Sequence, residues 1–312
     1  MIYRDFGKLG QKVSAVGMGC WNIGNQWGYM SDEEAAVIIK AALDSGINLL
    51  DTAEAYGDPH GTSEIRVGNT LKSLGIQRDK VVLVSKIGSW GFRQGEQLPN
   101  KTTDSVRLSG HAICGRLKTD YVDVVLCHKA LIEDPSVYIA GFEMLVKEGF
   151  ARSYGISTNS MDVLRRFYDL SDGKCAVLET DYSLINKQPE DDLIPFCQEH
   201  GIAVLARGPM AQGILAGKFS EDTVFKDDVR GKWNDGQPGR EDFLGKLALM
   251  RKVAKTVESF DESIPLAEAA IRYTISHPIA PVAIPGMTSL AQAQQNASVG
   301  SKLFSSEDWA KL

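Results

Sequence analysis

The chain has 312 residues, of which 43% are hydrophobic and 24% are charged, and its formal net charge is −6. This is ordinary globular composition, large enough for one big α/β domain or two smaller ones. The acidic balance argues against a nucleic-acid partner, and no apolar run approaches the roughly 18 residues of a membrane span. The first residues lack the basic and apolar regions of a signal peptide, so we expect a cytoplasmic protein.

The five cysteines are scattered and never spaced as CxxC, which favours reduced thiols over disulfides or a zinc site. The five histidines are equally dispersed, and no HExxH motif is present. We therefore expect no metal site. The sequence leaves the oligomeric state open.

A β-hairpin is predicted in residues 3–17, and eight strand–helix units follow it. The first helix should start at Ser31, which forms a capping box with Glu34, and should stop at Gly46. The expected strands are 17–20, 47–50, 81–85, 122–127, 152–157, 175–179, 202–206 and 281–284. The helices after the first are expected near 62–73, 103–117, 136–148, 161–169, 191–200, 266–276 and 289–299.

The strands are mostly continuous apolar runs, as parallel strands buried on both faces must be. Eight such units in a chain of this length favour an α/β fold of the (β/α)₈ TIM-barrel type, with residues 1–312 as a single domain. A doubly wound sheet is the alternative, but no GxGxxG follows the first strand. Residues 208–264 are predicted to form a long loop after the seventh strand, and loops of that length are usually functional or mobile.

Four polar residues follow the ends of three successive strands. Asp51 ends the second strand, and Tyr56 lies in the loop after it. Lys86 ends the third strand and His128 ends the fourth. The carboxyl ends of barrel strands share one rim, where active sites are built, so these four side chains should surround one pocket.

This combination is suited to protonating a carbonyl oxygen as it becomes an alkoxide. A phenol has a pKa near 10, and a nearby Lys86 would lower the pKa of Tyr56. Asp51 would keep Lys86 charged and oriented, and His128 would hydrogen-bond a substrate oxygen. No side chain can bring the hydride, which implies a nicotinamide cofactor. The plainer interpretation, a rim salt bridge and a buried histidine, fits any one of these residues better than all four together.

From these residues onward the chain resembles the aldo-keto reductase family, and the similarity covers nearly its whole length. The segments that carry the resemblance are DTAEAYG (51–57), VVLVSK (81–86), TDYVDVVLCH (119–128), YGIS (154–157), DYSLIN (181–186), ARGPMAQGILAGK (206–218) and IPGMTSLAQAQQN (284–296). The resemblance implies a barrel that interconverts a carbonyl and its alcohol with NADPH or NADH. It also implies that Asp51, Tyr56, Lys86 and His128 are the catalytic tetrad, with Tyr56 as the proton donor.

The resemblance further implies a set of cofactor contacts. These are Gly19, Cys20, Asp51, Ser157, Thr158, Glu179, Arg207, Gly208, Pro209, Met210, Gly213, Lys218, Gly286, Thr288, Gln292, Gln295 and Asn296. Within this set Lys218 stands where the family holds the pyrophosphate. Trp21 and Trp90 fall in rim loops, and together with Tyr56 and His128 they are expected to contact the substrate, a small carbonyl or alcohol.

Three of these positions depart from the family pattern. Thr158 stands where the family often has Asn, Glu179 where it usually has Gln, and Arg207 where many members stack a Tyr on the nicotinamide. A guanidinium plane can also stack. One hypothesis is that Glu179 and Arg207 form an ion pair beside the ring, and the other is that they are two independent rim charges.

The segment at the adenosine end, GMTSLAQAQQN (286–296), has no charged residue. Members that prefer NADPH commonly place Lys or Arg there to hold the 2′-phosphate, and charge-assisted contacts are roughly twice as strong as neutral ones. Arg230 or Lys232, in the long loop, could supply the missing charge. The cofactor is therefore NADP or NAD, with NADP favoured only by the family's habit.

Two other classes of function stay open at this point. In a lyase or aldolase-type barrel, Lys86 would form a Schiff base with the substrate. In a redox-sensing subunit, the barrel would bind the cofactor and turn over very little. The arrangement of Asp51 and Tyr56 favours a protonated Lys86 over a nucleophilic one, and the complete tetrad favours retained chemistry.

Overall fold

The computed structural model describes residues 1–90, 100–260 and 262–312. Its central sheet has eight parallel strands that pair in chain order. The strands are β3 (Met18–Gly19), β4 (Leu49–Asp51), β5 (Val82–Ile87), β6 (Val122–Cys127), β7 (Ala151–Ser157), β8 (Val177–Asp181), β9 (Ala203–Arg207) and β10 (Val282–Ile284). The two edges of the sheet meet through parallel bridges from Val16 to Ala283 and from Gly19 to Gly286. The predicted (β/α)₈ barrel is confirmed.

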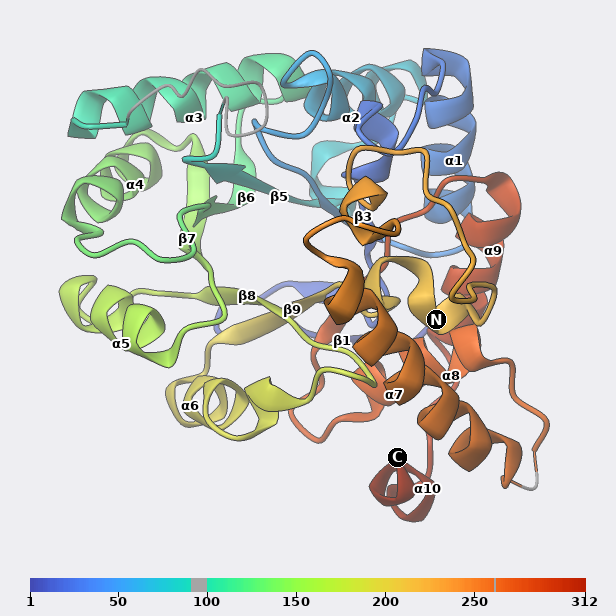
Figure 1. Cartoon of the computed structure of the whole chain (residues 1–312). Coiled ribbons are helices and arrows are strands. Elements are labelled where there is room, and N and C mark those ends of the chain that lie inside the picture. Colours follow the sequence, from blue (N-terminus) through green and yellow to red (C-terminus); the bar gives the residue numbers. More distant parts are fainter. Residues whose placement is uncertain (91–99, 261) are drawn as a thin grey trace.

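The eight expected helices form a ring around the strands (Figure 1). They are α1 (Asp32–Asp44), α2 (Thr62–Ser73), α3 (Thr103–Leu117), α4 (Ser136–Glu148), α5 (Met161–Leu170), α6 (Leu193–His200), α8 (Leu266–Ser276) and α9 (Leu290–Val299). The capping box of α1 is confirmed, since Ser31 Oγ accepts from the backbone of Glu34 and the Glu34 carboxylate accepts from the backbone of Ser31. Helix signals in the sequence were therefore reliable where a cap preceded an amphipathic repeat.

The prediction of a long loop over residues 208–264 is wrong. This segment contains the 19-residue helix α7 (Arg240–Glu258) and two short 3₁₀ turns, at Ala211–Ala216 and Gly231–Trp233. Buried side chains of α7 recur at helical spacing, and they pack with Trp233 and α8 in a second core cluster. The turn-forming residues just before α7 obscured this repeat. A short helix, α10 (Ser306–Lys311), was also not predicted.

The predicted N-terminal hairpin is confirmed as β1 (Tyr3–Asp5) paired antiparallel with β2 (Lys12–Ser14). Phe6 and Val13 of this hairpin are buried in one cluster with inward-facing residues of the barrel strands, such as Val82 and Val177. The hairpin thus fills the end of the barrel at which the strands begin. The opposite end of the barrel, where the strands finish, is not filled by this hairpin.

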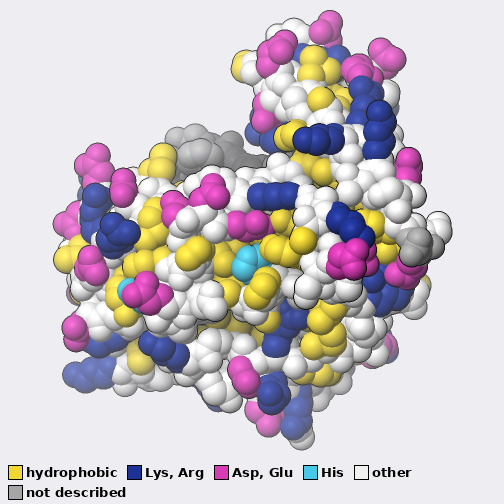
Figure 2. Space-filling view, turned by 90° about the horizontal axis from the view of Figure 1, so that it is seen from below, with side chains coloured by type: hydrophobic (Ala, Val, Ile, Leu, Met, Phe, Trp, Pro, Cys, Tyr) yellow, Lys and Arg dark blue, Asp and Glu magenta, His cyan; other side chains and the backbone are white. Residues whose placement is uncertain are grey.

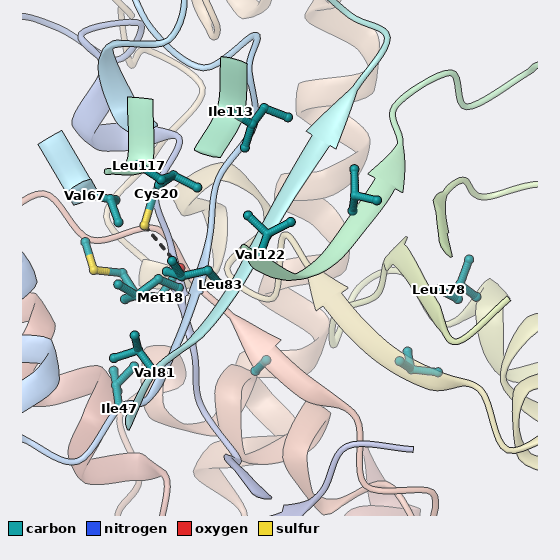
Figure 3. Close-up of a cluster of buried hydrophobic side chains, with 14 of the residues drawn as sticks. Met18, Cys20, Ile47, Val67, Val81, Leu83, Ile113, Leu117, Val122 and Leu178 are labelled. Carbon is teal, nitrogen blue, oxygen red and sulfur yellow. Dashed lines mark hydrogen bonds between the residues drawn. The ribbon is translucent and has the colours of Figure 1, made fainter. Parts of the chain in front are cut away.

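The core has an inner and an outer layer because side chains alternate along each strand. Leu49, Val82 and Val84 belong to the cluster inside the barrel, whereas Leu50 and Leu83 pack outward against the helices. Figure 3 shows part of the outer layer, where Met18 and Leu83 lie near Val67 of α2 and Leu117 of α3. This alternation decides which residues at the strand ends face the barrel axis.

The surface shown in Figure 2 carries acidic and basic side chains interspersed with scattered hydrophobic ones. No helix in residues 1–90, 100–260 and 262–312 combines the length and the apolar character needed to cross a bilayer.

The close packing of β7 on β8 gives a test of the barrel. Gly155 lies opposite Val177, and a β-carbon on Gly155 would be 1.9 Å from the carbonyl oxygen of Val177. Backbone cannot move away as a flexible side chain can, so Gly155→Ala should lower the free energy of unfolding by about 1–3 kcal/mol or more. Urea denaturation followed by circular dichroism would measure the change.

Gly115→Ala is the matched control. Gly115 lies inside α3, is exposed, and has no atom within 4 Å of its would-be β-carbon. Alanine has the higher helix propensity, so this variant should be more stable by about 0.5–1 kcal/mol. Equal effects of the two substitutions would contradict the assigned β7–β8 register.

Candidate active site

The site residues lie one step beyond the inner core on three neighbouring strands. Leu49, Val84 and Leu126 face the inside of the barrel. Two residues further along the same strands are Asp51, Lys86 and, just after β6, His128. The alternation therefore turns all three toward the axis at the open end of the barrel. An apolar layer lies beneath them, which isolates their charges from water on that side.

The ammonium group of Lys86 is held at the bottom of this end. Its Nζ donates to both carboxylate oxygens of Asp51, at 2.6 and 2.7 Å, and to the carbonyl oxygen of Thr52 at 3.0 Å. The side chain of Lys86 is fully buried. Three acceptors fix its orientation and satisfy its three donors, so Lys86 is structurally a cation and not a free amine.

A second carboxylate reaches the same ammonium group. Glu179 Oε2 lies 3.1 Å from Lys86 Nζ, and Glu179 Oε1 accepts from Ser157 Oγ at 3.3 Å. The hypothesis of a Glu179–Arg207 ion pair is wrong, since Arg207 donates instead to Asn159 Oδ1 at 2.9 Å.

The strand register explains this difference. Glu179 lies opposite Leu205, whereas Arg207 lies opposite Asp181, one inward-facing layer closer to the rim. Glu179 is therefore at the level of Lys86 and Asp51, and Arg207 is at the level of the cavity wall. Two residues that both end neighbouring strands in the sequence can therefore lie at different depths in the barrel.

Burial and charge together set the proton affinities on this floor. Burial alone would lower the pKa of Lys86, but Asp51 and Glu179 outweigh it and hold that pKa above its ordinary value. Burial raises the pKa of Asp51 well above its usual range, and the charge of Glu179 raises it further against the opposing effect of Lys86. The lysine is protonated, and both carboxylates depend on its single positive charge for compensation.

Tyr56 lies over this cluster. Its ring is 4.9 Å from Lys86 Nζ, stacks on Trp21 with 5.9 Å between ring centres, and meets the His128 ring edge-on at 5.8 Å. Lys86 does act to lower the pKa of Tyr56, as expected, but loss of hydration raises it by more. The expected effect of Lys86 is therefore present, but burial outweighs it, and the charges of Glu179 and Asp51 add to the rise in the pKa.

A large cavity opens above these residues. Its volume is about 1560 Å³, beyond the roughly 300–1,000 Å³ of ordinary small-molecule pockets. Asp51, Tyr56, His128 and Ser157 lie in its lining. The predicted cofactor contacts that also line it are Gly19, Arg207, Gly208, Pro209, Met210, Gly213, Lys218, Gly286, Thr288, Gln292, Gln295 and Asn296. One cavity thus connects the polar floor around Asp51 and Tyr56 with α9.

Some predicted site residues do not line this cavity. Cys20 is buried, with its thiol directed to the carbonyl oxygen of Met18, and the Thr158 hydroxyl donates to the carbonyl oxygen of Ala130. Glu179 lies behind Ser157 against Lys86.

Trp21 lines the cavity, but Trp90 is not among the described residues that do. The Trp90 ring packs edge-on against His60 at 5.2 Å and under the Arg116 guanidinium at 5.4 Å. His60 itself is in the lining. The expectation that Trp90 forms part of the substrate wall is therefore not met among the described residues, whereas His60, against which it packs, does line the cavity.

Several lining residues were missed in the sequence. Trp27 meets Trp21 edge-on with 5.0 Å between ring centres, and Gln26 Oε1 accepts from Trp21 Nε1 at 2.6 Å. Asn22 approaches the backbone of Gly286 so closely that a β-carbon there would be 1.7 Å from Asn22 Oδ1. Asn22, Gln26 and Trp27 all lie in the loop after β3, and a rim loop rich in amides and tryptophans was the available signal.

Basic side chains gather along the cavity although the whole chain is acidic. Lys218, Lys232 and Arg230 all line it, and all come from the segment between β9 and α8. Arg230 is paired with Asp227 and lies 5.2 Å from the Trp27 ring. Within the described parts of the chain, Lys218 and Lys232 form no ion pair. Two exposed, uncompensated cations make this wall attractive to an anionic ligand.

No group of three or more His, Cys, Asp or Glu residues suited to holding a metal ion occurs in the described part of the chain. All five cysteines are free and buried.

Comparisons with known proteins agree with this geometry. The methylglyoxal reductase YeaE of Escherichia coli is 31% identical over 301 residues, covering 96% of this chain and 90% of that protein. The holo form of the aldo-keto reductase AKR11C1 from Bacillus halodurans superposes with a TM-score of 0.80 at 27% identity, covering 100% of this chain and 95% of the other. An aldo-keto reductase from Klebsiella pneumoniae in complex with NADPH has a TM-score of 0.72 at 26% identity, covering 100% and 94%.

The sequence also matches the model of the aldo/keto reductase family over residues 15–312, from just before the first barrel strand to the end of the chain. That match spans every strand of the barrel and every residue of the floor and cavity described above. The chain belongs to the aldo/keto reductase family.

Proposed function

We propose that this protein is a nicotinamide-dependent oxidoreductase that interconverts a small aldehyde, ketone or sugar and its alcohol. Tyr56 is the general acid and base, and Asp51, Lys86 and His128 support it. The observation that carries the proposal is the stacked arrangement on the cavity floor. A fully buried, triply held Lys86 lies beneath the ring of Tyr56, and Tyr56 in turn faces both His128 and the cavity.

The cavity chemistry fits a nicotinamide dinucleotide. Its volume leaves room for a large ligand beside a small substrate, and its lining combines amide and hydroxyl groups with the cations Lys218, Arg230 and Lys232. The side chains that would hold the phosphates lie on the segment between β9 and α8, and those that would face the adenosine lie on α9, at Gln292, Gln295 and Asn296. When bound, the cofactor would supply or accept a hydride.

The chain's own residues would handle the proton. Tyr56 would donate its hydroxyl proton to the carbonyl oxygen, while the charge of Lys86 would stabilise the phenolate left behind. Asp51 would hold Lys86 in place during this step. His128 would orient the substrate oxygen, and Trp21 and Trp27 would exclude water from the floor.

The structure argues against the Schiff-base alternative. A nucleophilic lysine must be neutral and free to attack, but Lys86 is buried, donates to Asp51 and Thr52, and has a pKa above its ordinary value. The redox-sensing alternative is distinguished by rate. A sensor would bind the nucleotide tightly and reduce every carbonyl very slowly, although its floor would be built from the same residues.

The first prediction concerns the proton donor. Tyr56→Phe keeps the ring that stacks on Trp21 but removes the hydroxyl group, so kcat for carbonyl reduction should fall about 10²–10⁴-fold with little change in nucleotide affinity. Steady-state kinetics with methylglyoxal and a panel of other small carbonyls, together with fluorescence titration of bound nucleotide, would measure both quantities.

Tyr29→Phe is the control, because Tyr29 is 87% exposed and outside the lining of the main cavity, and it should leave kcat unchanged. If Tyr56→Phe retained kcat within a few fold, the assigned proton donor would be wrong. If the unaltered protein bound nucleotide and reduced no carbonyl at an appreciable rate, the sensor alternative would replace the reductase.

The second prediction concerns the choice between NADPH and NADH. Lys218 is assigned to the pyrophosphate, which both nucleotides carry, so Lys218→Ala should raise both dissociation constants about tenfold. Lys232 is assigned to the 2′-phosphate, so Lys232→Ala should raise the dissociation constant of NADPH alone by about tenfold, the typical value of a charge-assisted hydrogen bond. Titrations at one fixed salt concentration would show the difference.

Lys226→Ala is the control for general charge, because Lys226 is exposed on the same segment but does not line the cavity. It should change neither constant. Tighter NADH than NADPH binding by the unaltered protein, with no effect of Lys232→Ala, would identify NAD as the cofactor and remove the role given to Lys232.

A further inference from the structure

The floor of the cavity contains one more acidic group than its single cation can balance. Lys86 lies between Asp51 on β4 and Glu179 on β8, and the exposed fractions of Asp51, Lys86 and Glu179 are 3%, 0% and 1%. Two carboxylates and one ammonium group would together carry a charge of −1. A net charge in a site without water is strongly unfavourable, and a group in that position takes up a proton instead.

The surroundings of this cluster offer no second cation among the described residues. Asp51 and Glu179 each form an ion pair with Lys86 alone. Arg207, the inward-facing residue on β9, is engaged with Asn159. The charge of Lys86 also acts on the Glu64 carboxylate, but this carboxylate pairs with Arg116 and accepts a hydrogen bond from Ser85.

Two further titratable neighbours do not balance the charge either. Asp51 and Lys86 act on both Tyr56 and the thiol of Cys20, and burial raises the pKa of each above its ordinary value, so both are neutral. The ring of His128, just after β6, meets the ring of Tyr56 edge-on. Burial followed by the charge of Glu179 raises the pKa of Asp51 well above its usual range. Like carboxylates that share a site commonly retain one proton between them.

We propose that the buried cluster of Asp51, Lys86 and Glu179 holds one proton more than two carboxylates and one ammonium group would carry, and that the cluster releases it when a positively charged, oxidised nicotinamide binds but keeps it when the neutral, reduced form binds. The inference rests on the proposed function. Both carboxylates act at the cavity, since Asp51 lines it and Glu179 accepts a hydrogen bond from Ser157, which lines it. Glu179 is thus a positioning residue for charge on the floor, acting through Asp51 and Lys86.

The extra proton also completes the proton balance of carbonyl reduction. The carbonyl carbon would gain the hydride that a bound reduced nicotinamide supplies, the C–O π bond would break, and the oxygen would take the hydroxyl proton of Tyr56. The phenolate of Tyr56 would then take up the extra proton that the Asp51–Lys86–Glu179 cluster gives up. The cluster would finish with a charge of −1, which would balance the +1 of the oxidised ring.

Binding calorimetry of the unaltered protein with NAD⁺ and with NADH tests this directly. Each titration is repeated in two buffers of different ionisation enthalpy, which counts the protons exchanged on binding. Near neutral pH, binding of NAD⁺ should release more protons than binding of NADH, and the difference should be a substantial fraction of one proton. As the pH rises through the range in which binding releases this proton, the dissociation constant of NAD⁺ should fall by up to tenfold per pH unit relative to that of NADH. These nucleotides lack the 2′-phosphate, whose own titration would complicate the comparison.

Glu179→Gln should abolish the difference between the two nucleotides. Glutamine keeps the shape and the contact with Ser157, but Asp51 and Lys86 then balance each other and no extra proton is held. Glu54→Gln is the matched control. Glu54 is also buried, burial raises its pKa to about 7, and it accepts from the backbone of Gly88 instead of facing Lys86. It should retain the extra proton release. Circular dichroism confirms that each variant is folded.

The outcomes separate this inference from the proposed function. If the unaltered protein binds neither NAD⁺, NADH, NADP⁺ nor NADPH, the proposed function fails first. If NAD⁺ and NADH bind with equal proton release in the unaltered protein, the extra proton is excluded whether or not Glu179→Gln folds. If Glu54→Gln abolishes the difference while Glu179→Gln retains it, the proton belongs to Glu54 and the proposal is overturned.

Discussion

The alternation of side chains along closed parallel strands is the constraint on which the site depends. Because every second residue of β4, β5, β6 and β8 faces the barrel axis, the positions that follow the inner apolar layer must converge at one level. Asp51, Lys86 and Glu179 meet there without any loop to position them. The hairpin closes the other end of the barrel, so the polar layer has one exit, through Tyr56 and the cavity.

The charged residues of the floor lie directly on an apolar core, so the charge of each one has to be balanced by its neighbours. Lys86 has no access to water, so its charge is retained only because carboxylates compensate the loss of hydration. The same burial raises the pKa of Tyr56 and the pKa of Asp51 above their ordinary values. A ligand that brings charge onto the floor will therefore change protonation there. Proton transfer and ligand charge are therefore linked through the buried cluster of Asp51, Lys86 and Glu179, because the barrel around it has low polarity.

Much of this could be predicted from the sequence, for reasons that differ between features. Apolar runs and one predicted cap located the eight strand–helix units. Polar residues at and after the strand ends located four side chains that lie together, Asp51, Tyr56, Lys86 and His128. Depth could not be read in this way: Glu179 and Arg207 end neighbouring strands, yet the register separates them by one layer. Nor could the sequence show that His60 and not Trp90 lines the cavity, or that α7 begins within a stretch rich in turn formers. These features depend on contacts between distant segments, which local patterns do not contain.

The basic residues of the cavity wall belong to a different part of the molecule from the floor. Lys218, Arg230 and Lys232 lie on the insertion between β9 and α8, whereas the tetrad is built on and just after β4, β5 and β6. Substitutions in the insertion can therefore accumulate without disturbing the packing beneath Tyr56. In the proposed assignment, residues of the insertion set the preference for one nucleotide over the other, and residues at the ends of the strands carry out the proton chemistry. A substitution in the insertion would then change the preferred nucleotide and leave the proton chemistry in place.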